Sequence, residues 1–128
     1  MDDVISIEQA EIEVTKAVRR IALLHLAFAE TIVEEMGEEA GKELIVRAIR
    51  NYGSKIGGRA KKQVEEQGLP LTVENYGKVP GEAIPSIGTH SSIEAVEENG
   101  ENIIRTKGCE WASVWKEYGG EELGRLYC

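Results

Sequence analysis

Two apolar stripes with helical spacing constrain the fold of this chain more than any other feature. The first stripe advances in steps of three and four residues through Val14, Val18, Ile21, His25, Phe28 and Ile32. The second keeps the same spacing through Ile45, Ile49, Tyr52 and Ile56. Because this spacing places side chains on one side of an α-helix, the sequence predicts two long amphipathic helices, each with one apolar face.

Local signals predict where these helices begin and end. Ser6 and Gln9 have the spacing of a capping box, in which each side chain bonds the backbone amide of the other. The first helix should therefore begin there and reach about residue 36. Gly37 then interrupts the pattern as a C-cap or a kink. The second helix should end at Gly68, because a proline follows shortly afterwards.

Glycines recur at spacings of four residues in the second helical segment. An interior glycine costs about 1 kcal/mol relative to alanine, so each pair needs a compensating contact. We expect Gly37 and Gly41 to allow a sharp turn and close packing. We expect Gly53, Gly57 and Gly58 to allow close contact of the second helix with another element. On this interpretation, Gly57→Leu should destabilise the protein.

The remainder of the chain predicts a long connection, a hairpin and a short helix. Residues 68 to 91 contain all three prolines and no sustained period. Asn99-Gly100 is the favoured pair for a two-residue hairpin turn and separates SIEAVEE, which fits a strand or a helix, from a strand around residues 102 to 106. Helical spacing resumes at Glu110, breaks at Gly119-Gly120 and is followed by a further helical turn.

These elements predict an α+β fold in a single domain, residues 1–128. Two long antiparallel helices should pack on a small antiparallel sheet, with a short C-terminal helical segment covering one edge.

Charge and composition narrow the classes of partner. The formal net charge of −8 at pH 7 and the aromatic content of 5% oppose binding to nucleic acid or to an anionic membrane. No apolar run approaches the ~20 residues that span a bilayer, and the N-terminal residues are acidic where a signal peptide would be basic. We therefore expect a cytoplasmic protein with a small-molecule partner and two reduced cysteines.

Both histidines and both cysteines could carry chemistry. His25, on the apolar stripe, is either a general base, a metal ligand or a hydrogen-bonded core residue. His90, in the long connection, either reaches a substrate or is simply solvated. Cys109 and Cys128 lack the close spacing of zinc ligands, so no metal ligands are predicted from spacing and a metal site could arise only through folding. Cys128 is either a nucleophile or a buried apolar thiol.

The second helical segment contains a basic stretch, although the chain as a whole is acidic. Between Leu44 and Lys62 there is no acidic residue and there are six basic ones: Arg47, Arg50, Lys55, Arg59, Lys61 and Lys62. Such a segment either anchors a carboxylate or phosphate, or pairs with the glutamates that precede it.

The most distinctive stretch is CEWASVWKEYGGEELGRLYC, which follows the strand-like ENIIRTKG and is marked by Cys109, Ala112, Trp115, Gly119, Gly124 and Cys128. It resembles the L-2-amino-thiazoline-4-carboxylic acid hydrolase family, in which a strand leads into a cysteine, an aromatic helix, two spaced glycines and a second cysteine. The two N-terminal helices are similar to that family less specifically. Family members typically continue into an aspartate, a Phe-Asn-Pro element and further strands. This chain stops at Cys128, so it either lacks that segment or is a shortened relative, and open strand edges would favour a homodimer.

The resemblance implies hydrolysis of 2-aminothiazoline-4-carboxylate to N-carbamoyl-cysteine. This reaction needs a nucleophile, an acid for the leaving thiolate and a cation for the substrate carboxylate. As hypotheses, Cys128 or a water activated by His25 attacks the ring, and Cys109 either shares that site or is structural. The hypothetical substrate-binding residues are Arg19, Arg47, Arg50 and His90. The sequence does not identify a cofactor, which stays unknown at this point. Two alternatives stay open: a non-catalytic small-molecule-binding or sensor module, and a homodimeric assembly domain.

Overall fold

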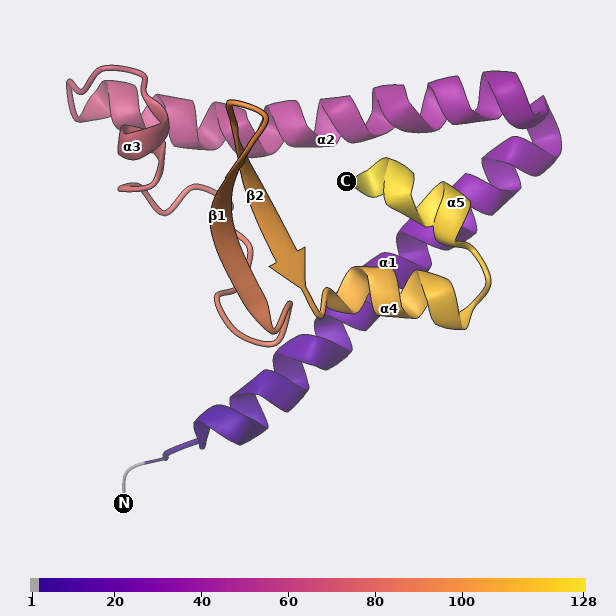
Figure 1. Cartoon of the computed structure of the whole chain (residues 1–128), viewed down its shortest axis with the longest axis horizontal. Helices are drawn as coiled ribbons and strands as arrows, with labels where there is room; N and C mark the ends of the chain where they lie inside the picture. The colour runs from indigo at the N-terminus through magenta and orange to yellow at the C-terminus, as the bar shows by residue number, and fades with distance from the viewer. Residues whose placement is uncertain (1–2) are drawn as a thin grey trace.

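The computed structural model describes residues 3–128 and shows two long helices, a β-hairpin and a helical C-terminal unit (Figure 1). The elements in chain order are α1 (Ile7–Met36), α2 (Glu38–Glu66), α3 (Val73–Tyr76), β1 (Ser92–Glu98), β2 (Glu101–Lys107), α4 (Glu110–Glu117), α5 (Glu121–Gly124) and the 3₁₀ helix η1 (Arg125–Tyr127). This arrangement confirms the predicted α+β fold.

The start of α1 confirms half of the predicted capping box. The Ser6 hydroxyl accepts a hydrogen bond from the backbone amide of Gln9 at 3.0 Å. The Gln9 side chain does not return to Ser6, because it donates to Glu13 one turn further along the helix. One side-chain bond therefore caps the helix where two were predicted.

A single residue, Gly37, joins α1 to α2. Its backbone angles, φ 84° and ψ 164°, lie in a region that residues with a Cβ rarely adopt. The chain reverses direction there and the two helices diverge from this corner (Figure 1). Next to the corner the helices pack closely, since a Cβ on Gly41 would lie 2.8 Å from the Cα of Val33. The sharp turn and close packing predicted for Gly37 and Gly41 are thus confirmed.

The prediction for the other glycines of α2 is wrong. A Cβ on Gly53, Gly57 or Gly58 would meet no atom within 4 Å outside its own helix and chain neighbours. Because α2 diverges from α1, its distal half has no close neighbour at these positions. Spacing placed these glycines correctly in a helix, but it did not reveal what the helix faces.

Two matched substitutions test this distinction. Gly57→Ala should raise the free energy of unfolding by about 1 kcal/mol, because the new methyl group lies in open space and alanine favours the helix. Gly41→Ala should lower it by about 1 to 3 kcal/mol despite the same propensity gain, because the methyl group presses on the Val33 backbone. Urea denaturation measures both. Equal gains in the two variants would contradict the close packing at the corner.

The hydrophobic core lies between α1 and the C-terminal unit, which consists of α4, α5 and η1. It consists of three buried residues of α1 and three of α4: Val18, Ala22, Leu26, Trp111, Val114 and Trp115. The Trp115 indole donates a hydrogen bond to the carbonyl of Ala22 at 3.0 Å. Gly120 and Gly124 let the end of the chain approach this core, because a Cβ on either would lie 2.4 Å or less from Leu26 or Trp115.

The hairpin pairs β1 with β2 in antiparallel register, with Ala95 opposite Ile104. Asn99 and Gly100 at its turn both have positive φ, 52° and 80°, as a type I′ turn requires. Both strands are therefore as the turn signal predicted, and SIEAVEE is a strand. The connection before the hairpin differs from the prediction because it contains α3, which the Thr72 hydroxyl caps. Across residues 3–128, no helix is both long and apolar enough to cross a membrane.

Candidate functional site

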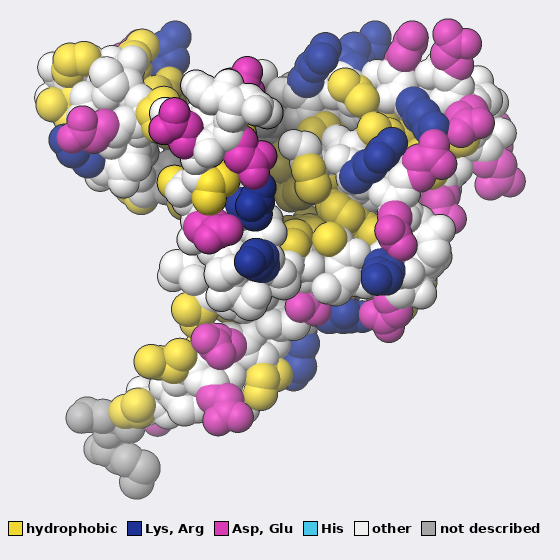
Figure 2. All heavy atoms as spheres, viewed as in Figure 1, with side chains coloured by type: hydrophobic (Ala, Val, Ile, Leu, Met, Phe, Trp, Pro, Cys, Tyr) yellow, Lys and Arg dark blue, Asp and Glu magenta, His cyan; other side chains and the backbone are white. Residues whose placement is uncertain are grey.

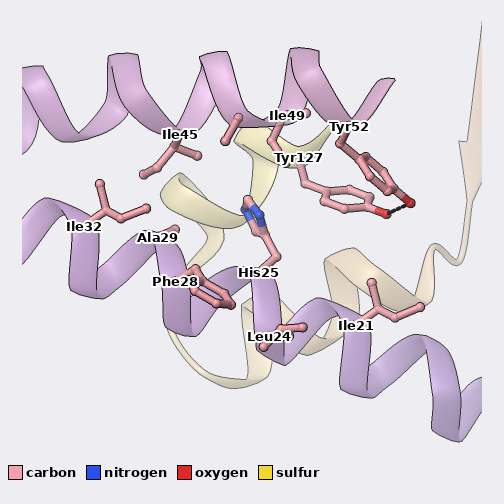
Figure 3. A pocket seen from close by; sticks show the side chains of 11 residues that line it. Ile21, Leu24, His25, Phe28, Ala29, Ile32, Ile45, Ile49, Tyr52 and Tyr127 are labelled. Carbon is pink, nitrogen blue, oxygen red and sulfur yellow. Dashed lines mark hydrogen bonds between the residues drawn. The ribbon is translucent and has the colours of Figure 1, made fainter. Parts of the chain in front are cut away.

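Two cavities flank the C-terminal unit. We call the first the interhelical groove, with a volume of about 520 Å³ (Figure 3). The α1 side chains that line it are Ile21, Leu24, His25, Phe28, Ala29 and Ile32. Ile45, Ala48, Ile49 and Tyr52 of α2 and Tyr127 of η1 complete the lining. The groove follows from the two apolar stripes, because the stripes face each other across the divergence of the helices.

His25 lies in the groove with its tautomer fixed by the backbone. Its Nε2 is 3.0 Å from the carbonyl oxygen of Leu123. Because a carbonyl only accepts, Nε2 donates in this bond and Nδ1 of the neutral ring carries the free lone pair. The ring also packs near Trp115 and Tyr127, with centroid separations of 5.7 and 5.3 Å. His25 is therefore both hydrogen-bonded to the core and open to the groove.

The two tyrosines of the groove form a pair. The Tyr52 and Tyr127 hydroxyls lie 3.3 Å apart, as the dashed line in Figure 3 shows. Burial, followed by the hydrogen bond with Tyr52, raises the pKa of Tyr127 well above its ordinary value. Tyr127 therefore stays protonated at neutral pH and contributes a hydroxyl group to the groove.

We call the second cavity the C-terminal cleft, with a volume of about 500 Å³. Ala112, Trp115 and Lys116 of α4 line one side, and Glu121, Glu122, Arg125 and Cys128 line the other. Lys42 of α2 contacts Glu122 at 2.5 Å and also Glu38 at 2.9 Å, so Glu122 is already paired. No ion pair forms within residues 3–128 at Lys116, Glu121 or Arg125. Lys116 and Glu121 thus carry charges of opposite sign in the cleft without an ion pair. The hydrogen bond with Lys42 lowers the pKa of the Glu122 carboxyl, and the nearby charge of Arg125 lowers it further.

Cys128 lines this cleft as a protonated thiol. Partial burial raises its pKa, and the negative charge of an ionised Cys109 raises it further. Cys109 itself packs against the hydrophobic core rather than lining the cleft. A raised pKa removes thiolate at neutral pH, and the thiolate is the nucleophilic form. The cleft therefore holds Cys128 in its less reactive state.

The reactivity of Cys128 should follow this shift. Its alkylation by iodoacetamide, read at that residue by mass spectrometry, should rise with a midpoint above the ordinary cysteine pKa of about 8.5. Cys109→Ser should move the midpoint to lower pH, because one of the two causes of the raised pKa is removed. A midpoint at or below that of a free cysteine would contradict the placement of the thiol.

The structure places the predicted carboxylate-binding residues in neither cavity. Arg19 contacts Glu110 at 3.3 Å and Glu117 at 2.6 Å, and so ties α1 to α4. Arg47 and Arg50 line a depression on the face of α2 that points away from the groove. Figure 2 shows charged side chains over the outer surfaces, with hydrophobic atoms in the hollow between α2 and α4.

His90, in the connection before β1, also lies outside both cavities. Its Nδ1 is 3.1 Å from the Thr89 hydroxyl, and its Nε2 is buried without a hydrogen-bond partner in the described chain. Two sets of roles stay predictions. The catalytic roles are those given to Cys128, Cys109 and His25, and the substrate-binding roles are those given to Arg19, Arg47, Arg50 and His90. Over residues 3–128, no group of three or more His, Cys, Asp or Glu side chains is arranged to hold a metal ion.

Sequence reasoning missed Lys116, Glu121 and Arg125 as site residues. Each is an exposed charged residue on a short C-terminal helix. No spacing distinguishes them from the other charged residues of the chain, so only the fold shows that they surround one cavity with Cys128. The signal that was available is their position between the two cysteines of the motif.

Comparison with known proteins supplies the family. The family model described as L-2-amino-thiazoline-4-carboxylic acid hydrolase matches residues 16–128, which include α1 from residue 16 onward, all of α2 and both cavities. No curated protein and no solved structure gives a significant match. The match extends well beyond the C-terminal motif and covers most of the sequence. The chain therefore belongs to the L-2-amino-thiazoline-4-carboxylic acid hydrolase family.

Proposed function

We propose that this chain hydrolyses a small cyclic amidine that carries a carboxylate, 2-aminothiazoline-4-carboxylate or a close analogue, and that the reaction takes place in the C-terminal cleft. The family name supports the class of reaction. The observation that carries the location is the set of charges in the cleft. Lys116 and Arg125 are cationic and Glu121 is anionic, and all three side chains line the cleft.

The substrate matches these charges. A protonated 2-aminothiazoline ring is a planar cation, and its 4-carboxylate is an anion on the same small molecule. Arg125 and Lys116 hold the carboxylate through charge-assisted hydrogen bonds. Glu121 faces the ring cation. The interhelical groove lacks any charged lining residue, so it suits this zwitterion poorly.

In the proposed reaction, water attacks the ring carbon between nitrogen and sulfur. Glu121 accepts a proton from that water as the carbon–oxygen bond forms. The new hydroxyl group then loses its proton to solvent as the carbon–sulfur bond breaks, and the departing sulfur takes the first proton back from Glu121. The product is N-carbamoyl-cysteine with a free thiol, which contains the atoms of substrate and water and nothing else. Because Cys128 is protonated at neutral pH, it lines the cleft in this scheme and does not attack.

Thiol release from 2-aminothiazoline-4-carboxylate tests the proposal. Glu121→Gln should lower kcat by about 10²- to 10⁴-fold, because the general base is lost. Arg125→Gln should lower kcat/KM by about 10- to 100-fold, because one charge-assisted contact to the carboxylate is lost. A thiol reagent reads the product after subtraction of the protein's own cysteines.

Arg47→Gln and Cys128→Ser complete the experiment. Arg47→Gln is the matched control, since Arg47 is an exposed arginine outside the cleft, and its activity should equal that of the unaltered chain. Cys128→Ser should retain activity if water attacks. Loss of activity in Cys128→Ser with native folding would replace water by the thiol as nucleophile. No thiol release from any form, or loss in Arg47→Gln with full activity in Arg125→Gln, would overturn the proposed site.

A further inference from the structure

The interhelical groove is the cavity that lies outside the proposed hydrolytic site. None of its lining residues is charged, although charged residues make up 30% of the chain. Several of its apolar side chains are open to solvent, among them Leu24, which is 60% exposed, and Phe28, which is 62% exposed. Contiguous apolar surface of this kind is costly to leave in water and commonly marks a binding site.

The size of the groove favours a small molecule. Its volume of about 520 Å³ lies within the range of roughly 300 to 1,000 Å³ that is typical of small-molecule pockets. The walls come from two long helices joined at the Gly37 corner, with Tyr127 closing one side (Figure 3). Such a cavity accommodates a ring system between the aliphatic side chains of α1 and α2.

Three polar groups stand in the otherwise apolar wall. His25 presents Nδ1 as an acceptor, since its Nε2 donates to Leu123 and no residue of the described chain bonds Nδ1. In the Tyr52–Tyr127 pair one hydroxyl donates to the other, which leaves the second hydroxyl proton free. The wall therefore offers one acceptor and one donor, and it contains no lysine, arginine or carboxylate side chain. A few convergent polar groups in an apolar cavity fix the orientation of a ligand.

We infer that the interhelical groove binds a neutral ring compound that carries a hydroxyl or amide group. The ring fills the apolar walls, and the polar group donates to His25 or bonds the tyrosine pair. A charged ligand is disfavoured, because the groove has no counter-charge and its apolar walls desolvate the ligand. An anion is further disfavoured by the net charge of −8. This inference does not depend on the hydrolysis proposed for the cleft.

Calorimetric titration with two probes of the same shape tests the inference. 2-Naphthol is neutral and carries a hydroxyl group, whereas naphthalene-2-carboxylate is an anion. We expect 2-naphthol to bind once per chain, and the carboxylate to bind at least about tenfold more weakly, a difference of about 1.4 kcal/mol. Equal binding of the two probes would overturn the charge argument.

Two matched substitutions locate the bound probe. Ala48 lines the groove and is exposed, so Ala48→Phe should fill the cavity without disturbing the core and weaken 2-naphthol binding by about tenfold or more. Ala27 is an exposed alanine of α1 outside the groove, and Ala27→Phe should leave binding unchanged. Equal affinities of the two variants would place the probe elsewhere and overturn the inference.

Sedimentation of the same samples separates a ligand from a second copy of the chain. If the groove binds a small molecule and not a second copy, the unaltered protein and Ala48→Phe should have the same oligomeric state in sedimentation. If the unaltered protein is instead a dimer that Ala48→Phe dissociates, and 2-naphthol does not bind, then a second copy occupies the groove and the inference is wrong.

Discussion

Trp115→Ala should lower the free energy of unfolding by about 3 to 5 kcal/mol, the largest effect we expect from any truncation in this chain. Trp115 is 2% exposed and packs against α1 at the centre of the core. Its truncation leaves a cavity and also removes the donor to the Ala22 carbonyl, which then stays buried without that bond. Urea denaturation followed by circular dichroism measures the loss.

Two further variants interpret this result. Trp115→Phe keeps most of the ring but loses the indole N–H, so the difference between the two Trp115 variants separates packing from hydrogen bonding. Leu24→Ala removes a side chain of α1 that is 60% exposed. It should lower the free energy of unfolding by no more than about 0.5 kcal/mol. A Trp115→Ala cost as small as that of Leu24→Ala would mean that the core is not centred on α4.

Gly124→Val should be the most damaging insertion of atoms, with a cost of about 3 kcal/mol or more. A Cβ at residue 124 would lie 2.3 Å from ring atoms of Trp115, which is less than any tolerated contact. The indole cannot move away easily, because the core and the Ala22 carbonyl hold it. The melting temperature and the urea midpoint should both fall.

A double substitution shows whether this clash is the cause. Combining Gly124→Val with Trp115→Ala removes the two ring atoms that a Cβ at residue 124 would meet at 2.3 Å, so part of the loss should be recovered and the two effects should not add. Strict additivity of the two free-energy changes would indicate that Gly124→Val acts through the backbone and not through Trp115.

The long helices were predictable because their signal is local and repeated. The stripe through Val18 and Ile21 predicts α1 to the correct final residue, and α2 ends at Glu66, just before the predicted end at Gly68. The hairpin was equally predictable, because Asn99-Gly100 encodes the type I′ turn in two residues. The short helix α3 was not, since its four residues give no period and only the Thr72 cap marks it.

Contacts between distant segments account for the predictions that were wrong or missing. The spacing of Gly53 and Gly57 predicted a shared helix face correctly, but whether another element covers that face depends on how α1 and α2 diverge. Spacing gave no prediction for Gly124, because the Trp115 ring that leaves no room for a Cβ there belongs to a separate helix. Close approach at a glycine is a property of the assembled fold, and no pattern within one helix specifies it.

Some features of the candidate site could be predicted from local sequence patterns, and others depend on contacts between distant segments. His25 and Cys128 each line a cavity, but they line different ones. The periodicity of α2 already contained the information that Arg47 lies away from the groove, since a residue two positions from Ile45 and from Ile49 is about 160° to 200° around the helix. Lys116 and Arg125 gave no such signal, because surface charges look alike in a sequence.

The order in which the ribosome delivers the core segments has a consequence for the nascent chain. Trp115 and Ala22 are 93 residues apart, and Arg19 and Glu117 are 98 apart, so α1 cannot bury its apolar side until α4 has been synthesised. At bacterial and eukaryotic elongation rates of roughly 5 to 20 residues per second, this delay lasts roughly 5 to 20 s. During that time the newly made α1 exposes Val18 and Leu26, and it is the segment of the growing polypeptide that we expect a chaperone to bind.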